Sequence, residues 1–483
     1  QSDLRASVID VQWIVEAYAL FLASLLLVGG ALGDRYGRRR VYGIGVAMFA
    51  LSSVWCGFAQ NPTQLILGRG LQGIGGALLV PGSLAIIGAS FDEARRGQAI
   101  GTWSGFTGIT SALGPVLGGW LIENVSWRWI FLINLPIAII VLVAMVKHVP
   151  ESRDETAPDQ LDWTGAFLAV VGLGALTYGL IESSSAGLSN SMVLIALTLG
   201  LMALIGFVVL EAHTEHPMLP LGLFRSRAFT IMNVLTLLLY AAITGALFYV
   251  PFNLIQVQGY SATAAGSALI PMILIISLLS RWSGGLVHKT GAKLPLTVGP
   301  LIAAAGFALF ARTGTGGSYW TEFFPAVVVL GLGMAVSVAP LTTTVMSAVE
   351  QRHSGLASGI NNAVSRVAGL LAIAIMSIIL IGVFRSTVQP ALTGLNLSAE
   401  VRQTLDAELS KLAAAQIPAD LDPDTARAVK QSIDRAFING FRAIMLVAAG
   451  MAAAGGITVA MFLEPREHGD PTRRIRATHE EAT

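Results

Sequence analysis

The chain of 483 residues is 54% hydrophobic and only 12% charged, and its formal net charge is +1. A soluble globular protein carries about 25% charged residues, so this composition excludes an ordinary soluble domain and predicts a chain that contacts lipid along most of its length. The near-zero net charge gives no support for nucleic-acid binding, and the single cysteine, Cys56, excludes a disulfide framework or a cysteine-based metal cluster.

Thirteen stretches are long and apolar enough to cross a membrane as helices, since a crossing needs about 20 mostly apolar residues. They predict an all-α membrane protein with many passes. The first seven lie near residues 11–33, 41–59, 64–88, 97–122, 128–147, 163–182 and 190–212. The other six lie near residues 228–252, 262–282, 294–311, 321–347, 356–384 and 438–463.

Basic residues are distributed unevenly among the connections. Alternate connections and the C-terminal tail together carry 18 Lys and Arg residues, whereas the short connections on the opposite side carry three. Because Lys and Arg are retained on the cytoplasmic side, this bias predicts a multi-pass protein of the cell inner (plasma) membrane with a cytoplasmic C-terminus. Residue 1 is then expected on the outer side.

The connection after the first stretch combines glycines, an acid and four arginines in residues 30–40. Asp34, Arg35, Gly37 and Arg38 are spaced so that a tight turn brings a carboxylate next to guanidinium groups. We expect this charge network to dock one helix bundle on another and to hold one conformation until it breaks. The alternative, a simple positive anchor on the cytoplasmic side, accounts for the arginines but not for the Gly and Asp spacing.

A weaker copy of this connection occurs at residues 284–293. Gly30, Leu32, Gly37 and one basic position recur 254 residues later, at a connection on the same predicted side. Such a repeat is typical of transporters built from two related halves around a central site. His288 stands in place of the acid, so we expect the second copy to be more structural than functional.

Three stretches together resemble one family. The turn at residues 30–40, the segment at residues 67–75 and the Gly-Pro-Val-Leu-Gly-Gly sequence of residues 114–119 are similar to motifs of the fourteen-helix drug/proton antiporters of the major facilitator superfamily. The resemblance covers essentially the whole chain. It implies a major facilitator fold in a lipid bilayer and the export of small hydrophobic or cationic compounds, as in multidrug efflux, in exchange for protons and without a cofactor.

The resemblance also implies a domain organisation of two six-helix bundles with two helices inserted between them. The first bundle is expected in residues 1–160, the inserted helices in residues 161–213, the second bundle in residues 214–464 and a cytoplasmic tail in residues 465–483. In the resembling family one more helix, which carries a coupling acid, precedes the position of Gln1. We therefore expect a further helix to complete the first bundle.

Ionisable and polar side chains inside the apolar stretches of the first half are candidate site residues. A charge at the centre of a bilayer costs at least about 2.5–3.5 kcal/mol, so Arg69 is expected to have a functional role rather than to snorkel from a helix end. The resemblance implies that Arg69 takes part in proton coupling, and we expect Gln72 to shape the same cavity. Glu16 lies near the outer end of the first stretch, where it either carries protons or is wetted at the interface beside Trp13 and Tyr18.

Small residues gather in the fourth stretch. They remove side chains and one backbone donor, so the helix can bend and approach a neighbour closely. The resemblance implies a role in occlusion and antiport, and ordinary packing of small residues is the alternative. These residues are Gly108, Gly114, Pro115, Gly118 and Gly119.

The stretch at residues 356–384 has a polar face in the second half of the chain. It is formed by Asn361, Asn362 and Arg366. We expect these side chains to face a cavity or a charge partner rather than lipid, because polar side chains within a membrane are costly.

The only long external connection is predicted at residues 385–437, which are too polar to span a membrane. Asp422 followed by Pro423 predicts a helix start, and apolar residues recur at helical spacing on both sides of it, which indicates a small external helical hairpin. A solvated spacer is one interpretation. A lid or a surface for an external partner is the other.

Two other functions fit parts of the sequence. The same fold could export an endogenous metabolite, a lipid or an antibiotic. A membrane sensor or membrane enzyme finds less support, because no nucleophile motif, phosphate-binding loop or metal-ligand spacing is apparent. The acids and histidines near one helix end, Glu211, His213, Glu215 and His216, are interpreted as a solvated loop.

Overall fold

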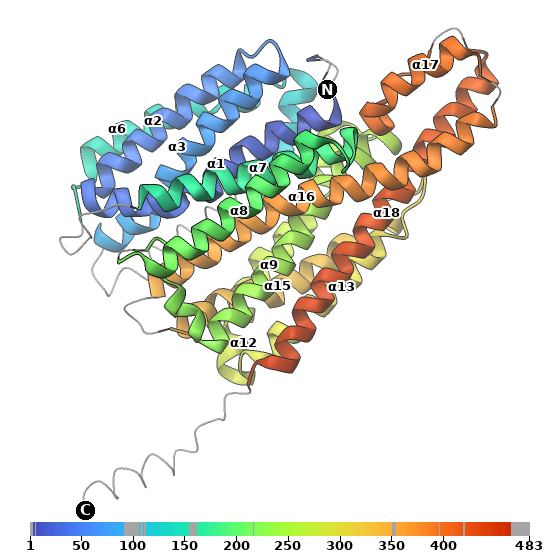
Figure 1. The fold of residues 1–483 in the computed structure, drawn as a ribbon. Coiled ribbons are helices and arrows are strands. Elements are labelled where there is room, and N and C mark those ends of the chain that lie inside the picture. Colours follow the sequence, from blue (N-terminus) through green and yellow to red (C-terminus); the bar gives the residue numbers. More distant parts are fainter. Residues whose placement is uncertain are drawn as a thin grey trace, which may run out of the picture.

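The computed structural model describes residues 3–4, 6–90, 106, 110, 113–153, 162–215, 217–349, 354–395, 397–418 and 421–464. Over these ranges the chain contains helices and no strand, and twelve helical segments are long and apolar enough to cross a membrane (Figure 1). They match twelve of the thirteen predicted stretches. The remaining stretch, residues 97–122, lies largely outside the described residues, and residues 113–124 at its end are helical.

The first group of helices packs through small residues. A Cβ added to Gly73 of α3 would lie 2.4 Å from the carbonyl oxygen of Tyr18 in α1, so the two backbones approach more closely than a side chain permits. Ser7 and Asp10 form a capping box that fixes the start of α1. The helices of this group are α1 (Val8–Tyr36), α2 (Arg38–Gly57), α3 (Pro62–Ser90), α5 (Trp129–Leu132) and α6 (Asn134–His148).

The second group of helices surrounds one large apolar core. Its largest fully buried side chains include Phe229, Phe307 and Phe437. The connection into the group is η1 (Leu221–Arg225). The first half of the group contains α9 (Arg227–Phe248), α10 (Val250–Phe252), η2 (Asn253–Val257), α11 (Ala262–Ser267), α12 (Ile270–Thr290) and α13 (Lys293–Phe310). Its second half contains α14 (Tyr319–Glu322), α15 (Phe324–Ser347), α16 (Ser354–Thr393), α17 (Ala399–Glu408), η4 (Leu409–Ala414) and α18 (Pro423–Phe462).

Two helices between these groups form a hairpin, α7 (Trp163–Ala186) and α8 (Ser191–His213). Helix α7 contacts α1 of the first group and α16 of the second. The pair therefore lies along the seam between the two groups (Figure 1).

The repeated connection turns at a glycine with positive φ in both copies. Helix α1 ends at Gly37 with φ +108°, and α12 ends at Gly291 with φ +75°. Positive φ is accessible to glycine at little cost, and in each copy the next helix starts within two residues. The sequence repeat at a spacing of 254 residues is therefore also a structural repeat.

The last two long helices extend well beyond any membrane. Helices α16 and α18 have 40 residues each, which gives a length of about 60 Å against a hydrocarbon core of about 30 Å. Their projecting ends carry α17 and η4, at the end of the molecule opposite residues 34–40 (Figure 1). We call this part, residues 385–437, the external projection, after the side predicted for it from the sequence.

The predicted helix start in the external projection is confirmed, because Asp422 caps α18 and Pro423 occupies its first turn. The helices extend past the predicted ends of the neighbouring spans, at residues 384 and 438. Both helices continue without a break, since Val388 and Val429 are fully buried and extend the apolar stripe past the membrane.

Candidate functional site

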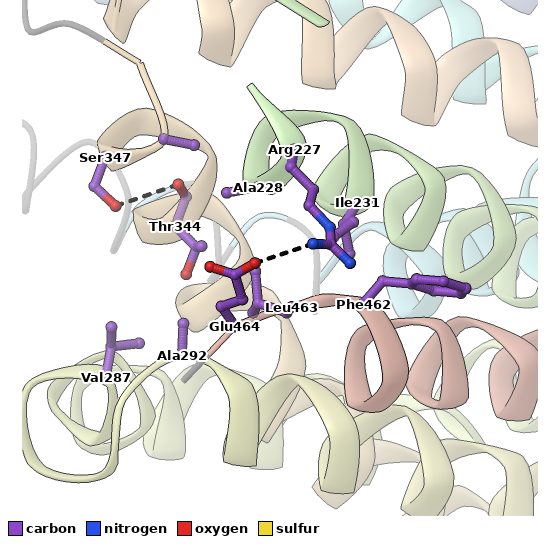
Figure 2. A pocket seen from close by; sticks show the side chains of 11 residues that line it. Arg227, Ala228, Ile231, Val287, Ala292, Thr344, Ser347, Phe462, Leu463 and Glu464 are labelled. Atoms are coloured by element: carbon purple, nitrogen blue, oxygen red, sulfur yellow. Dashed lines mark hydrogen bonds and ion pairs between the residues drawn. The ribbon is translucent and has the colours of Figure 1, made fainter. Parts of the chain in front are cut away.

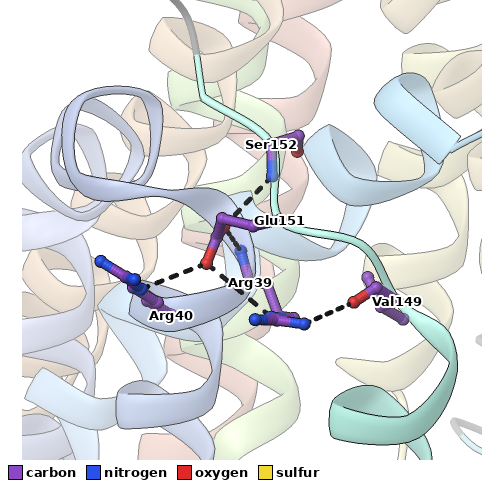
Figure 3. A network of polar contacts seen from close by, with 5 residues as sticks. All are labelled: Arg39, Arg40, Val149, Glu151 and Ser152. Carbon is purple, nitrogen blue, oxygen red and sulfur yellow. Dashed lines mark hydrogen bonds and ion pairs between the residues drawn. The ribbon is translucent and has the colours of Figure 1, made fainter.

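The connection at residues 34–40 forms a network of ion pairs at one end of the first group (Figure 3). Asp34 pairs with Arg38 at 2.8 Å. The carboxylate of Glu151, in the segment after α6, lies 3.8 Å from Arg39 and 3.6 Å from Arg40. Arg39 also donates a hydrogen bond of 3.0 Å to the carbonyl oxygen of Val149. We call this end of the molecule the basic end.

The network differs from the prediction that it joins two bundles. In the parts of the chain that are described, its partners all belong to the first group, because Glu151 fills the space beside Gly37. A Cβ at Gly37 would lie 2.7 Å from that carboxylate, which is the flexible end of a side chain, so the demand for glycine comes from the turn with φ +108°. Arg35 does not join these pairs but lies over the ring of Tyr36, 5.1 Å from its centre. The sequence missed Glu151.

Arg69 of α3 is held inside the first group without an acidic partner among the described residues. Its Nε donates to the carbonyl oxygen of Ile14 at 2.9 Å, and its Nη1 donates to Oε1 of Gln72 at 2.5 Å. The guanidinium lies 4.3 Å from the ring centre of Tyr18, in cation–π geometry. Arg69 is thus a partly buried cation held by a carbonyl oxygen, an amide oxygen and an aromatic ring.

Gln72 extends the same network into α2. Its amide donates a hydrogen bond of 2.6 Å to the hydroxyl of Ser53, and the side chain is 1% exposed. Asn134 of α6 reaches the same hydroxyl at 3.4 Å. In this conformation Gln72 therefore lies within the packed interior of the first group rather than at an open surface.

A second polar cluster lies on the seam between the two groups. Gln12 of α1 donates a hydrogen bond of 2.9 Å to the hydroxyl of Tyr249, which follows α9, and both side chains are fully buried. Glu16 lies one turn further along α1, is 0% exposed and interacts electrostatically with Tyr249. Neither oxygen of Glu16 has a hydrogen-bond partner within the described ranges. The alternative of a wetted interfacial carboxylate does not fit this burial.

The small residues of the fourth stretch approach the second group. A Cβ at Gly119 would lie 2.5 Å from the carbonyl oxygen of Ala262, and one at Gly266 would lie 2.2 Å from that of Pro115. The helix at residues 113–124 is therefore in backbone contact with α11. Added Cβ atoms at Gly114 and Gly118 would meet nothing within 4 Å, and Gly108 lies outside the described residues.

A carboxylate strengthens this contact at the end of the molecule opposite the basic end. Oε2 of Glu123 accepts hydrogen bonds from the hydroxyl of Thr263 at 2.6 Å and from its backbone N–H at 3.3 Å. These bonds lower the pKa of Glu123. The sequence did not single out either residue, because the interaction joins positions 140 residues apart.

The polar face of α16 is divided between packing and exposure. Asn361 donates hydrogen bonds to Asn233 at 3.1 Å and to Thr236 at 2.6 Å, so it ties α16 to α9. Asn362 and Arg366 are exposed.

A cavity of about 370 Å³ lies at the basic end of the second group (Figure 2). Arg227 and Glu464 pair across it at 3.0 Å, but their side chains are 60% and 81% exposed, and such surface pairs contribute about 0–1 kcal/mol. The residues that line the cavity belong to α9, α12, α15, α18 and the residues next to them, all within the second group. The cavity is therefore not at the seam. Over the described residues no group of three or more His, Cys, Asp or Glu side chains is placed to hold a metal ion.

Comparisons with known proteins agree with this architecture. A profile of the Major Facilitator Superfamily matches residues 1–373. The tetracenomycin C resistance and export protein of Streptomyces glaucescens is 34% identical over 79% of this chain and 70% of its own length. The multidrug transporter protein MdtP of Bacillus subtilis (strain 168) is 30% identical over 76% of this chain and 68% of its own. The puromycin resistance protein pur8 of Streptomyces alboniger is 32% identical over 79% and 76%.

Solved structures share the fold. A bacterial homolog of the human lysosomal transporter Spinster, in an inward-facing and unoccupied conformation, aligns with a TM-score of 0.62 over 96% of this chain and 92% of that chain. Its sequence identity is 16%, so the likeness concerns the fold alone.

Proposed function

The chain belongs to the Major Facilitator Superfamily, and on that premise we propose that it is a proton-coupled antiporter that exports small hydrophobic or cationic compounds. It is a membrane transporter of small molecules, not an enzyme. Relatives named for multidrug transport and for resistance to tetracenomycin C and puromycin support this class of cargo.

We further propose that the protein lies in the plasma membrane with its basic end in the cytoplasm. The excess of Lys and Arg at this end supports that orientation. The helix at residues 113–124 and α11 then meet on the outer side, and the external projection faces the exterior.

The observation that carries proton coupling is the environment of Glu16. An ionised carboxylate without a partner is costly in an apolar interior, so a fully buried Glu16 favours the neutral acid. When the seam opens to water, the same side chain can release its proton. Since the hydrogen bond between Gln12 and Tyr249 crosses the seam beside it, protonation of Glu16 and closure of the seam favour one another.

The contact of Gly119 with α11 would close the outer side in this conformation. Antiport needs the two groups to rock about a central site, so that the site is exposed to one side at a time. Separation at Gly119 and Pro115 would open the outer side. Glu16 would then bind a proton from the outer side as the cargo leaves. It would release that proton to the cytoplasmic side when the next cargo molecule is loaded.

Two other networks would support the cycle. The partly buried guanidinium of Arg69 would provide a fixed positive charge in the first group, and this charge would interact differently with the protonated and the cargo-bound states. The ion pairs of Asp34, Arg38 and Glu151 fix the basic end of α1, the helix that carries Glu16. We propose that they steady this helix during rocking.

The test is transport by the purified chain in proteoliposomes with an imposed pH gradient and a fluorescent lipophilic cation as cargo. The wild type is expected to move the dye against its gradient only when the pH gradient is present. Glu16→Gln should abolish gradient-driven movement of the dye, because the amide cannot bind and release a proton as a carboxyl group does. Glu464→Gln, at a carboxylate that is 81% exposed, is the matched control and should transport normally. Equal gradient-driven uptake by Glu16→Gln and wild type would refute the assignment.

Export of an antibiotic made by the producing cell is a second candidate function. It is favoured by relatives named for resistance to single antibiotics, including methylenomycin A and puromycin. A competition series in the same proteoliposomes separates the two. Inhibition by many unrelated cations supports multidrug export, whereas inhibition by one compound class alone supports the dedicated exporter.

A further inference from the structure

Two acidic side chains meet at the basic end of the inserted helices. Asp162 lies directly before α7 and caps it, because its Oδ1 accepts a hydrogen bond of 2.7 Å from the backbone N–H of Gly165. Glu211 lies in the last turn of α8, and its Oε2 accepts a hydrogen bond of 2.9 Å from the backbone N–H of Leu219. Each carboxyl thus uses one oxygen to hold the backbone.

The other two oxygens face each other. The position that a Cβ of Gly165 would occupy lies 2.3 Å from Oδ2 of Asp162 and 3.0 Å from Oε1 of Glu211. Both oxygens are shielded from solvent, and neither has a hydrogen-bond partner among the described residues. Glu211 is only 3% exposed, so the sequence-based interpretation of this region as a solvated loop is wrong for this residue.

The elements around this pair provide no compensating cation in the described parts of the chain. Asp162 is the charged group that interacts electrostatically with Glu211. On the same helix end, His213 is exposed and contacts the carbonyl oxygen of Val209, and Glu215 is exposed. Helix α7, which packs along α8, carries one charged residue, Glu182, four residues from its opposite end.

Two adjacent carboxyl groups in a dry site cannot both be ionised without a cation between them. A single shared proton removes the repulsion and supplies the missing hydrogen bond, from the protonated carboxyl to the ionised one. We propose that Asp162 and Glu211 share one proton, which makes the basic end of the inserted helices a proton-binding site separate from Glu16. The site is built from two oxygens that the fold aims at each other and leaves otherwise unused.

The shared proton would fasten three segments to one another. Asp162 holds the start of α7, Glu211 holds the end of α8, and Leu219 belongs to the linker that leads into η1 and the second group. Loss of the proton leaves two carboxylates in repulsion and loosens the linker. The site thus makes the connection between the inserted helices and the second group sensitive to pH on the basic side. This inference does not depend on the cargo or on Glu16.

The test is thermal unfolding of the purified full chain in detergent between about pH 5 and about pH 9, compared between variants. The shared proton is present at low pH and is lost as the pH rises, so its contribution to stability disappears toward high pH. Asp162→Asn replaces the proton by an amide N–H, which donates to Glu211 at every pH. We expect the unfolding temperature of the wild type to fall more steeply with rising pH than that of Asp162→Asn. Glu215→Gln, at an exposed acid, should keep the wild-type slope.

A second measurement keeps the proposal testable if Asp162→Asn does not fold. In the infrared difference spectrum between the wild type and Glu211→Gln near neutral pH, we expect a protonated carboxylic acid band that only the wild type has, because the amide of Glu211→Gln donates to Asp162 instead. A band from neutral Glu16 is common to both and cancels. Equal pH slopes in wild type and Asp162→Asn would overturn the proposal. So would a stabilisation of the wild type at high pH by added Na⁺ or Mg²⁺, because it would assign a metal cation to the two oxygens instead of a proton.

Discussion

An alanine at Gly119 adds one methyl group at the tightest point between the helix at residues 113–124 and α11. The new Cβ would lie 2.5 Å from the carbonyl oxygen of Ala262, which is backbone and cannot rotate away. The two helices therefore have to separate by several tenths of an ångström or more. Because this contact joins the two groups of helices, the strain falls on the conformation described here and not on one in which the groups have parted.

The size of the effect follows from the cost of overpacking a close contact, which is about 1–3 kcal/mol. A free-energy difference of this size shifts the ratio of two conformations by about 5-fold to about 150-fold. Gly118 provides the matched control, since an added Cβ there meets nothing within 4 Å. The two variants differ only in which side of the same helix receives the methyl group.

The assay is a distance measurement by pulsed electron paramagnetic resonance between spin labels at Gln60→Cys and Thr321→Cys, two exposed positions in the connections opposite the basic end. The native Cys56 is fully buried, so labels attach to the introduced cysteines. Gly119→Ala should increase the population with the longer distance by the factor given above. If Gly119→Ala and Gly118→Ala give the same distance distribution, the contact does not control closure of this side.

Arg69→Lys keeps the charge but loses the planar guanidinium fork that bonds the carbonyl of Ile14 and the amide of Gln72 while lying over Tyr18, so we expect a loss of about 1.5–3 kcal/mol, measured as a lower unfolding temperature. In the external projection, Leu405→Ala removes a fully buried side chain at a cost of about 2–5 kcal/mol, and faster hydrogen exchange over residues 399–414 should report it, whereas the exposed Gln403→Ala should have no effect. Hydrogen bonds from Lys411 and from a backbone N–H lower the pKa of Glu408. The ionised Glu408 therefore contributes to order in η4 at neutral pH, and this contribution is lost as the pH falls through that pKa. Acidification should therefore accelerate exchange in η4 of the wild type, and Glu408→Gln should remove this pH dependence.

Local patterns account for what could be predicted from the sequence. Apolar stretches of sufficient length located the spans, Gly37 and Gly291 marked the two equivalent turns, and Asp422 with Pro423 marked a helix start. Each of these signals acts over a few residues, so one sequence contains it in full.

The contacts that define the candidate site join distant parts of the chain and leave no such signal. The bond between Gln12 and Tyr249 joins residues 237 positions apart. Glu211 is polar and stands beside other polar residues, so its sequence context indicates a wet loop, and its burial depends on how α7 and the linker fold around it. Glu16 is a candidate from the sequence because a carboxyl group in an apolar stretch is conspicuous. Only the structure shows that its oxygens have no hydrogen-bond partner among the described residues.

Helix α16 runs unbroken from the seam to the tip of the external projection. A continuous rod about 60 Å long converts a tilt of about 10° at one end into a displacement of about 10 Å at the other. Any rocking of the second group is therefore amplified at the tip of the projection, and in the proposed orientation a large reagent such as an antibody fragment has access to that tip from outside the cell. In that orientation, a labelled binder on the projection would report such a displacement without entering the path of the cargo.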